Sequence, residues 1–270
     1  MRKFLIFVIL FTAACQAPPR VEIAEVPFEP DSGTIAIRCG ALIDGLSDEA
    51  QRERLVVIRN GVFSEVLAAD STVPASTPFL DLSEYTCLPG LIDTHTHIGM
   101  LPEDSSDYGV YLRRSADDTR ELAAHNAEIT LQAGFTTIRQ VADYLAWVDR
   151  DIRERVTGGT LAGPRIQVGG YYLTVPHGGG DMQIPGVDDE AIPSYYRRGI
   201  ARGPEQFRQN AQDLVDDGAE VLKVIASGAV FAFDGVPGAP EMTQDEIAAV
   251  VDVAHAAGLR VTAHAHGAQS

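Results

Sequence analysis

Apolar positions after Gly90 follow two alternating patterns along the chain. Short continuous apolar runs predict buried parallel strands, and stretches with apolar residues three and four apart predict helices. The expected strands are Leu91–His97, Thr136–Val141, Arg165–Gly169, Glu220–Ser227 and Leu259–His264. The expected helices are Ser115–Ala133, Asp143–Val156, Pro204–Asp217 and Thr243–Ala257. Repeated strand–helix units predict an α/β fold built on a parallel sheet.

Two features refine this pattern. Thr243 and Glu246 have the spacing of a helix-capping box, and Gly258 is suited to end the same helix. Residues 170–203 show no period, and a loop of that length in a compact domain is more often functional than idle.

Residues 34–89 have a different pattern, with short β-branched runs broken by turns. Asn60-Gly61 lies between two such runs and predicts a tight hairpin. We therefore expect a small β domain at 34–89, followed by a larger domain at 90–270.

Histidines stand at two of the expected strand ends. His95 and His97 close the first strand, and side chains two apart on a strand point the same way. His264, followed by His266, closes the fifth strand. A lone strand histidine is more often structural, but two such patterns on successive strand–helix units favour a metal site, because active sites of strand–helix barrels lie at the carboxyl ends of the strands.

Lys223 lies inside an apolar strand, "VLKVIAS". Burying a bare ammonium there is costly, so either the side chain reaches solvent at the strand end or a lowered pKa leaves the amine neutral. A neutral amine can add carbon dioxide and become an anionic carbamate, which can bridge two divalent cations.

The chain begins like an exported protein. Arg2-Lys3, the apolar run from Phe4 to Phe11 and the small residues before Cys15 predict a signal peptide at 1–15, and residues 16–33 predict a linker. Thr12-Ala13-Ala14-Cys15 resembles a bacterial lipobox, although the usual pattern has Leu where Thr12 stands. We expect a periplasmic or cell-surface protein, lipid-anchored at Cys15, with plain secretion as the alternative.

Composition adds two constraints. The formal net charge of −17 disfavours binding to nucleic acid through charge. Cys39 and Cys87 are the cysteines beyond Cys15, and in an oxidising compartment they either form a disulfide or remain two buried thiols.

Together these motifs resemble the amidohydrolase superfamily, in particular its imidazolonepropionase-like and Xaa-Pro dipeptidase-like branch. The similarity extends over nearly everything after residue 34. It is carried by "LPGLIDTHTHI", "AGFTTIRQVAD", "GPRIQVGGYYLT", "GAEVLKVIASGAV" and "GLRVTAHAHG". The resemblance implies a (β/α)8 TIM-type barrel, of which about the first five β/α units are present, preceded by part of a β-sandwich.

The same resemblance implies roles for individual residues. His95 and His97 would bind a first metal, carboxylated Lys223 would bridge two metals, and His264 would bind the second. His177, in the glycine-rich third loop, and His266 would lie near substrate, unless they are ordinary polar loop residues. The implied cofactors are two divalent metal ions, with zinc expected and manganese or cobalt able to substitute, and carbon dioxide as the carbamate.

The implied activity is hydrolysis of amide or peptide C–N bonds by a metal-bridging hydroxide, with dipeptides or N-acyl amino acids as small-molecule substrates. A cyclic-amide hydrolase or a deaminase is the alternative within the superfamily, but its deaminases usually lack the lysine. A non-catalytic metal-binding lipoprotein is the alternative outside enzymes.

One departure from the family pattern is substantial. The pattern requires a further histidine ligand after strand six and a general-base aspartate after strand eight, and this sequence ends at Ser270, after the fifth expected strand. We therefore expect the chain to be the N-terminal portion of a longer protein, or a truncated product, with weak metal binding and no hydrolysis when it is alone.

Overall fold

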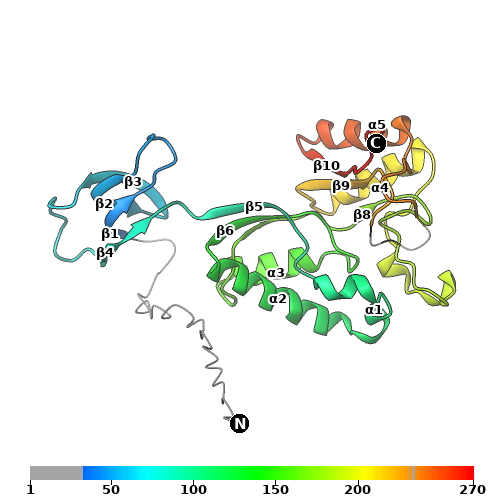
Figure 1. Cartoon of the computed structure of the whole chain (residues 1–270), viewed down its shortest axis with the longest axis horizontal. Coiled ribbons are helices and arrows are strands. Elements are labelled where there is room, and N and C mark those ends of the chain that lie inside the picture. The colour runs from blue at the N-terminus through cyan, green and yellow to red at the C-terminus, as the bar shows by residue number, and fades with distance from the viewer. Residues whose placement is uncertain (1–32, 231, 233–234) are drawn as a thin grey trace, which may run out of the picture. The chain divides into compact units, whose positions relative to one another are not determined.

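The structure is a computed structural model that describes residues 33–230, 232 and 235–270 (Figure 1). The signal peptide, the lipobox cysteine and nearly all of the linker expected from the sequence lie outside the described residues. None of the helices in the described ranges is both long enough and apolar enough to cross a bilayer.

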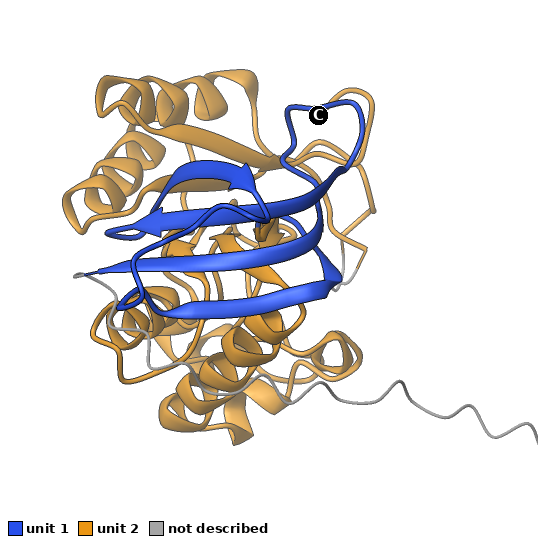
Figure 2. Ribbon diagram, turned by 90° about the vertical axis from the view of Figure 1, so that its left-hand side faces the viewer, with its two compact units in different colours: residues 1–89 blue, residues 90–270 orange. Residues whose placement is uncertain are grey.

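The chain divides into two compact units between Pro89 and Gly90 (Figure 2). This division falls where the sequence changes from strand-and-turn patterning to alternating strands and helices. Each unit is described separately below.

The described part of the first unit is one four-stranded sheet with the order β3-β2-β1-β4. Its strands are β1 (Thr34–Leu42), β2 (Gln51–Arg59), β3 (Val62–Ala68) and β4 (Phe79–Cys87). β1 is antiparallel to β2 and parallel to β4. The expected hairpin joins β2 to β3, with positive φ at Asn60 (51°) and Gly61 (73°), as a tight hairpin turn needs.

A disulfide joins Cys39 on β1 to Cys87 on β4, with 5.8 Å between the α-carbons. Of the two alternatives that the sequence left open, the structure therefore has the paired one. Cys39 is buried, and Leu42 and Val56 belong to the same small apolar cluster. The bond thus ties the two parallel strands of this sheet at its core.

The second unit contains two three-stranded parallel sheets, with the orders β5-β6-β7 and β10-β9-β8. The strands of the first sheet are β5 (Leu91–Thr96), β6 (Phe135–Gln140) and β7 (Arg165–Gln167). Those of the second are β8 (Tyr172–Leu173), β9 (Val221–Ile225) and β10 (Arg260–His264). The α/β class and the parallel order predicted from the sequence are confirmed.

The third expected strand, Arg165–Gly169, is present as β7, which pairs with β6. The chain then enters β8, which was not predicted and pairs with β9 in the other sheet. Gly169 lies between β7 and β8, and a β-carbon there would lie 2.5 Å from the carbonyl oxygen of Gln140. A residue with a side chain would therefore clash with the backbone of the neighbouring strand.

Helices cover these sheets (Figure 1). They are α1 (Val110–Arg113), α2 (Ala116–Gln132), α3 (Val148–Thr157), α4 (Pro204–Asp216) and α5 (Gln244–Ala256). Three short 3-10 helices are η1 (Pro102–Ser106), η2 (Asp189–Ala191) and η3 (Ser194–Tyr196). The predicted capping box is present at α5, where the Thr243 hydroxyl accepts from the backbone N–H of Glu246.

One helix boundary was predicted wrongly. The helix expected from Asp143 begins at Val148, because Ala142 and Trp147 have φ values of 70° and 68°, which a right-handed helix does not allow. The intervening segment turns inward, and Asp143 is buried.

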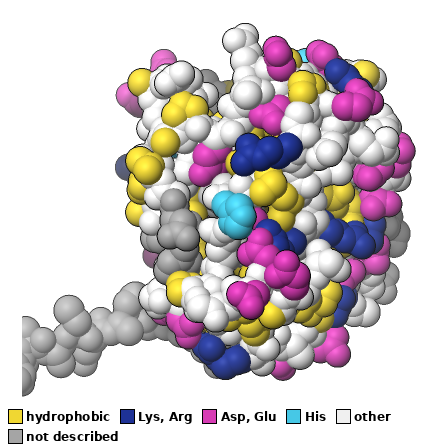
Figure 3. Space-filling view, turned by 90° about the vertical axis from the view of Figure 1, so that its right-hand side faces the viewer, with side chains coloured by type: hydrophobic (Ala, Val, Ile, Leu, Met, Phe, Trp, Pro, Cys, Tyr) yellow, Lys and Arg dark blue, Asp and Glu magenta, His cyan; other side chains and the backbone are white. Residues whose placement is uncertain are grey.

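The core of the second unit is formed by large apolar side chains from strands and helices together. Its fully buried members include Ile138, Ile152, Phe207, Leu214 and Leu222. Acidic side chains are spread across the face drawn in Figure 3, with Lys and Arg between them, as expected for a chain of net charge −17.

Candidate metal centre

Strand register brings two of the expected site residues, Lys223 and His264, to one face of the second sheet. Lys223 on β9 pairs with Tyr172 on β8 and with Thr262 on β10, so the side chains of these three residues lie on the same face. His264 is two residues beyond Thr262 and therefore shares that face.

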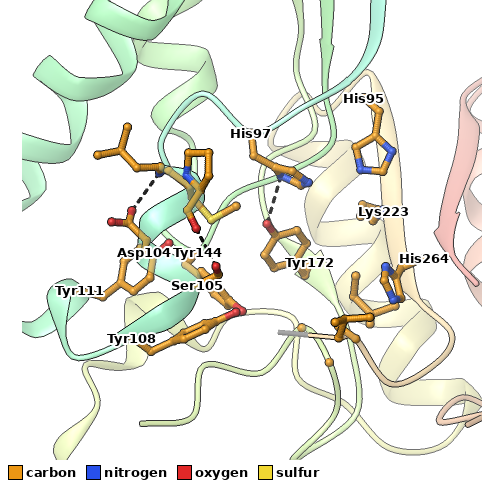
Figure 4. Close-up of a pocket in the computed structure, with 18 of the residues that line it drawn as sticks. His95, His97, Asp104, Ser105, Tyr108, Tyr111, Tyr144, Tyr172, Lys223 and His264 are labelled. Atoms are coloured by element: carbon orange, nitrogen blue, oxygen red, sulfur yellow. Dashed lines mark hydrogen bonds between the residues drawn. The ribbon is translucent and has the colours of Figure 1, made fainter. Parts of the chain in front are cut away.

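His95 and His97 meet this group from the other sheet. The two rings are 5.3 Å apart between centroids, one at the end of β5 and one just beyond it. Both rings, the Lys223 side chain and the His264 ring line one cavity of about 610 Å³ (Figure 4). The structure therefore brings together all four residues that the sequence suggested as metal ligands.

His97 is the most firmly held of the four. Its Nδ1 atom donates to the carbonyl oxygen of Ala142 over 2.8 Å, and the Tyr172 hydroxyl lies 3.2 Å from the same nitrogen. A carbonyl oxygen can only accept, so Nδ1 carries the proton and Nε2 keeps its lone pair. Burial lowers the pKa of His97 to about 4, which keeps the ring neutral at pH 7.

His264 has an available ligand atom. Its Nε2 atom is buried and has no hydrogen-bond partner among the described residues. The His266 ring stacks on it at 4.2 Å, and His266 also lines the cavity, as expected for a residue near substrate. Burial is the largest cause of the lowered pKa of His264.

Lys223 is almost completely buried, with 2% of its surface exposed. No hydrogen bond or ion pair to its amine is found within the described part of the chain. Burial lowers the pKa of Lys223 to about 8. Of the two explanations offered by the sequence, the structure favours a partly neutral amine over a side chain that reaches solvent.

The imidazoles suit a divalent metal, since neutral imidazole is a ligand that such ions take. The buried Nε2 atom of His264 has no hydrogen-bond partner among the described residues, as is expected of a nitrogen that binds a metal. The described residues contain no group of three or more His, Cys, Asp and Glu side chains placed to hold a metal. His95, His97 and His264 therefore do not form such a group by themselves.

A buried polar network that the sequence did not reveal lies behind His97. Gln140 accepts from the backbone N–H of Ile98 and from the Thr96 hydroxyl, and donates to Asp143. Asp143 also accepts from the N–H of Gly99. Burial raises the pKa of Asp143 well above its usual value. These bonds fix the backbone on both sides of His97.

His177 is placed differently from the expectation. Its side chain is 63% exposed, and its Nε2 atom lies 3.9 Å from Asp189. It is not among the residues that line the cavity. The loop that carries it is anchored by Arg197, whose guanidinium donates to both oxygens of the buried Asp181. A role of His177 near substrate therefore stays a prediction.

Sequence reasoning also missed an aromatic wall opposite the histidines. Tyr108, Tyr111, Tyr144 and Tyr172 line the same cavity and contact one another edge to face or at a tilt. The only local signal was the spacing of Tyr108 and Tyr111, which puts both on one side of a helical turn. The remaining tyrosines come from other strand ends.

Comparison with known proteins assigns the chain to a class. The profile of the amidohydrolase family matches residues 86–270, which is more than half of the sequence. The chain therefore belongs to the amidohydrolase family.

Individual relatives include hydrolases of small molecules. Ochratoxinase from Aspergillus niger is 28% identical over 248 residues, which is 86% of this chain and 50% of the relative. A Xaa-Pro dipeptidase structure with methionine bound in the active site is 30% identical, with a TM-score of 0.76 over 88% of this chain and 58% of that one. The A. niger ochratoxinase structure has a TM-score of 0.72 at 25% identity and covers 88% of this chain and 57% of that one. The chain spans about half the length of the curated relatives it matches.

Proposed function

We propose that this chain carries the first metal-binding half of a hydrolase that cleaves amide C–N bonds. The observation that carries the proposal is that His95, His97, Lys223 and His264 line one cavity at the strand ends. Membership of a family that is generally metal-dependent supports it.

In this proposal His95 and His97 would hold one divalent metal and His264 a second, with Lys223 as a carbamate supplying a further anionic ligand. Metals bound there would polarise the amide carbonyl and activate water. The chain's own contribution is to keep the imidazoles neutral by burial and to fix the His97 tautomer through Ala142.

Lys223 is suited to form the carbamate because its pKa of about 8 leaves a fraction of the amine neutral at pH 7. The nitrogen lone pair adds to the carbon of carbon dioxide, and the amine loses one proton. The product is an anionic carbamate that can bind two cations, which also compensate for burying its charge.

Dipeptides or N-acyl amino acids are the substrates we propose, supported by the similarity to a Xaa-Pro dipeptidase. A cyclic-amide hydrolase or deaminase is the competing proposal within the family, and the buried Lys223 favours the two-metal hydrolase over the deaminase. The third alternative is a metal-binding lipoprotein without catalytic activity. It would bind metal but hydrolyse no amide, so an activity measurement distinguishes it from the hydrolase.

The carbamate can be tested directly because the sequence contains two lysines, Lys3 and Lys223. We expect ¹³C-bicarbonate with zinc to give one carbamate resonance in the ¹³C NMR spectrum. The Lys223→Gln variant should lose that resonance and the Lys3→Gln variant should keep it. If zinc-loaded protein treated with ¹³C-bicarbonate gives no carbamate resonance, Lys223 is not carboxylated and the proposal is contradicted.

Activity is tested on the protein produced from its complete reading frame. Loading with zinc should give two metals per chain and hydrolysis of dipeptides or N-acyl amino acids. Lys223→Ala should lose the bridged metal and most activity, whereas Lys223→Glu should retain some, since a carboxylate replaces part of the bridge. Full activity in Lys223→Ala overturns the mechanism.

A further inference from the structure

Aromatic rings line one side of the cavity, with Tyr108, Tyr111 and Tyr144 away from Lys223 and Tyr172 between them and Lys223 (Figure 4). Tyr144 contacts Tyr108, Tyr111 and Tyr172 with ring centroids 5.8, 5.3 and 5.3 Å apart and interplanar angles of 75°, 68° and 80°. These are edge-to-face arrangements, which aromatic rings favour over face-to-face stacking. We refer to these four residues as the tyrosine wall.

The tyrosine wall is connected directly to the proposed metal ligands. The Tyr172 ring lies 6.0 Å from the His97 ring, and its hydroxyl is 3.2 Å from His97 Nδ1. A group bound against the wall would therefore lie beside the atoms that are proposed to react. The rings come from three separate segments, near α1, after β6 and on β8, and each is less than one-tenth exposed. Because they hold one another by ring contacts, the shape of this end of the cavity is set before substrate arrives.

The wall is uncharged. A tyrosine hydroxyl has an ordinary pKa of about 10, so the hydroxyls of the wall are neutral at pH 7. The carboxylate at this end, Asp104, already receives two hydrogen bonds from Arg114, at 2.8 and 2.9 Å, and one from the N–H of Leu101. A substrate ammonium would therefore compete with an existing ion pair.

Apolar side chains complete the surroundings. Met100, Leu101 and Pro102 line the cavity near the wall, and Ile225 and Val230 also line it. A charged substituent placed here would lose its hydration without gaining an unengaged partner of opposite sign from the wall. A flat apolar ring would gain edge-to-face contacts with the tyrosines as well as burial.

We propose that the tyrosine wall is a specificity subsite that accepts an uncharged aromatic side chain of the substrate, next to the amide that is cleaved. The inference rests on the proposed function for the position of that amide. It adds the substrate class: aromatic amides and peptides, with acidic and basic ones disfavoured.

Binding tests the subsite without requiring turnover. The probes are the N-acetyl amides of phenylalanine, leucine, glutamate and lysine, because each carries its side chain between two amide groups. They are titrated against the protein from the complete reading frame by calorimetry or ligand-observed NMR. We expect the phenylalanine probe to bind at least 10-fold more tightly than the glutamate and lysine probes, and a few-fold more tightly than the leucine probe.

Matched variants locate the preference. Tyr111→Leu should reduce the preference for phenylalanine over glutamate at least 5-fold, and Tyr144→Phe should keep it, since the ring remains. Tyr171→Leu is the control, because Tyr171 is equally buried but packs on Trp147 and does not line this cavity. Circular dichroism checks that each variant is folded.

The outcomes separate this proposal from the proposed function. Selective binding of the phenylalanine probe, in protein that neither binds zinc nor hydrolyses amides, supports the subsite and refutes the hydrolase. Hydrolysis with two metals but equal binding of all four probes, or no binding of any, overturns the subsite. Equal loss of preference in Tyr111→Leu and Tyr171→Leu overturns it as well.

Discussion

His97 and Tyr172 meet at one nitrogen, where the Tyr172 hydroxyl lies 3.2 Å from an Nδ1 atom that already donates to the carbonyl oxygen of Ala142 at 2.8 Å. The backbone carbonyl makes the shorter contact and is sufficient to fix the tautomer. The tyrosine hydroxyl is a second, weaker partner, and the Nε2 atom is left for a metal.

The first prediction follows from this difference. Tyr172→Phe should keep the metal content and weaken zinc affinity by less than about 10-fold, because the Ala142 carbonyl still orients the ring. His97→Ala should weaken it by more than about 100-fold, since it removes a ligand. Competition with a coloured zinc chelator measures both. An equal loss in the two variants would mean that the hydroxyl, not the carbonyl, orients His97.

The second prediction concerns the disulfide in the first unit. Cys39 and Cys87 close a loop over a sequence separation of 48 residues. In the chain-entropy account, breaking a loop of that size costs about 4 kcal/mol of unfolding free energy. Urea unfolding with and without reductant should show a loss of about 2–4 kcal/mol, and Cys39→Ser with Cys87→Ser should show the same loss without reductant. Alkylation of both thiols in unreduced, folded protein would contradict the bond.

The third prediction concerns a buried carboxyl group. Asp149 accepts from the N–H groups of Gly169 and Gly170 and is 1% exposed. Burial outweighs those hydrogen bonds and raises its pKa to about 6. The folded state therefore holds this proton more tightly than the unfolded state, and the stability it contributes is present below about pH 4 and lost as the pH rises through 6.

Relative to Asp149→Asn, the parent protein should lose about 2–3 kcal/mol of unfolding free energy between pH 4 and pH 7. Urea unfolding at four pH values in this range measures the difference. Asp252→Asn, on the exposed side of α5, is the control. A pH-independent difference for Asp149→Asn would show that the carboxyl titrates normally.

The fourth prediction concerns export, which we propose from Arg2-Lys3, the apolar run that follows and Cys15. Expressed in a bacterium with lipoprotein processing, the protein should fractionate with membranes and incorporate labelled palmitate. Cys15→Ser should release it and abolish labelling, whereas Cys39→Ser should leave both unchanged. A soluble wild-type protein whose mature N-terminus is not Cys15 would refute the anchor.

Local patterns in the sequence were sufficient for several parts of the structure. The hairpin at Asn60-Gly61 and the capping box of Thr243 and Glu246 depend on residues a few positions apart, so neighbouring side chains specify them. The same holds for His95 and His97, because alternation along a strand puts both on one side whatever surrounds them. Lys223 was conspicuous because a lysine in an apolar strand requires a special explanation.

Only the tertiary structure decided the rest. The late start of the helix expected from Asp143, the pairing of Cys39 with Cys87 and the assembly of the tyrosine wall depend on segments that are distant in sequence. The pattern of apolar residues does not predict which strand ends will lie side by side, because that depends on sheet register and on the path of the connecting loops. By itself the sequence identified His95, His97, Lys223 and His264 as candidate metal ligands. The fold determined that they share one cavity with the tyrosines, because parallel strands bring their carboxyl ends to the same side.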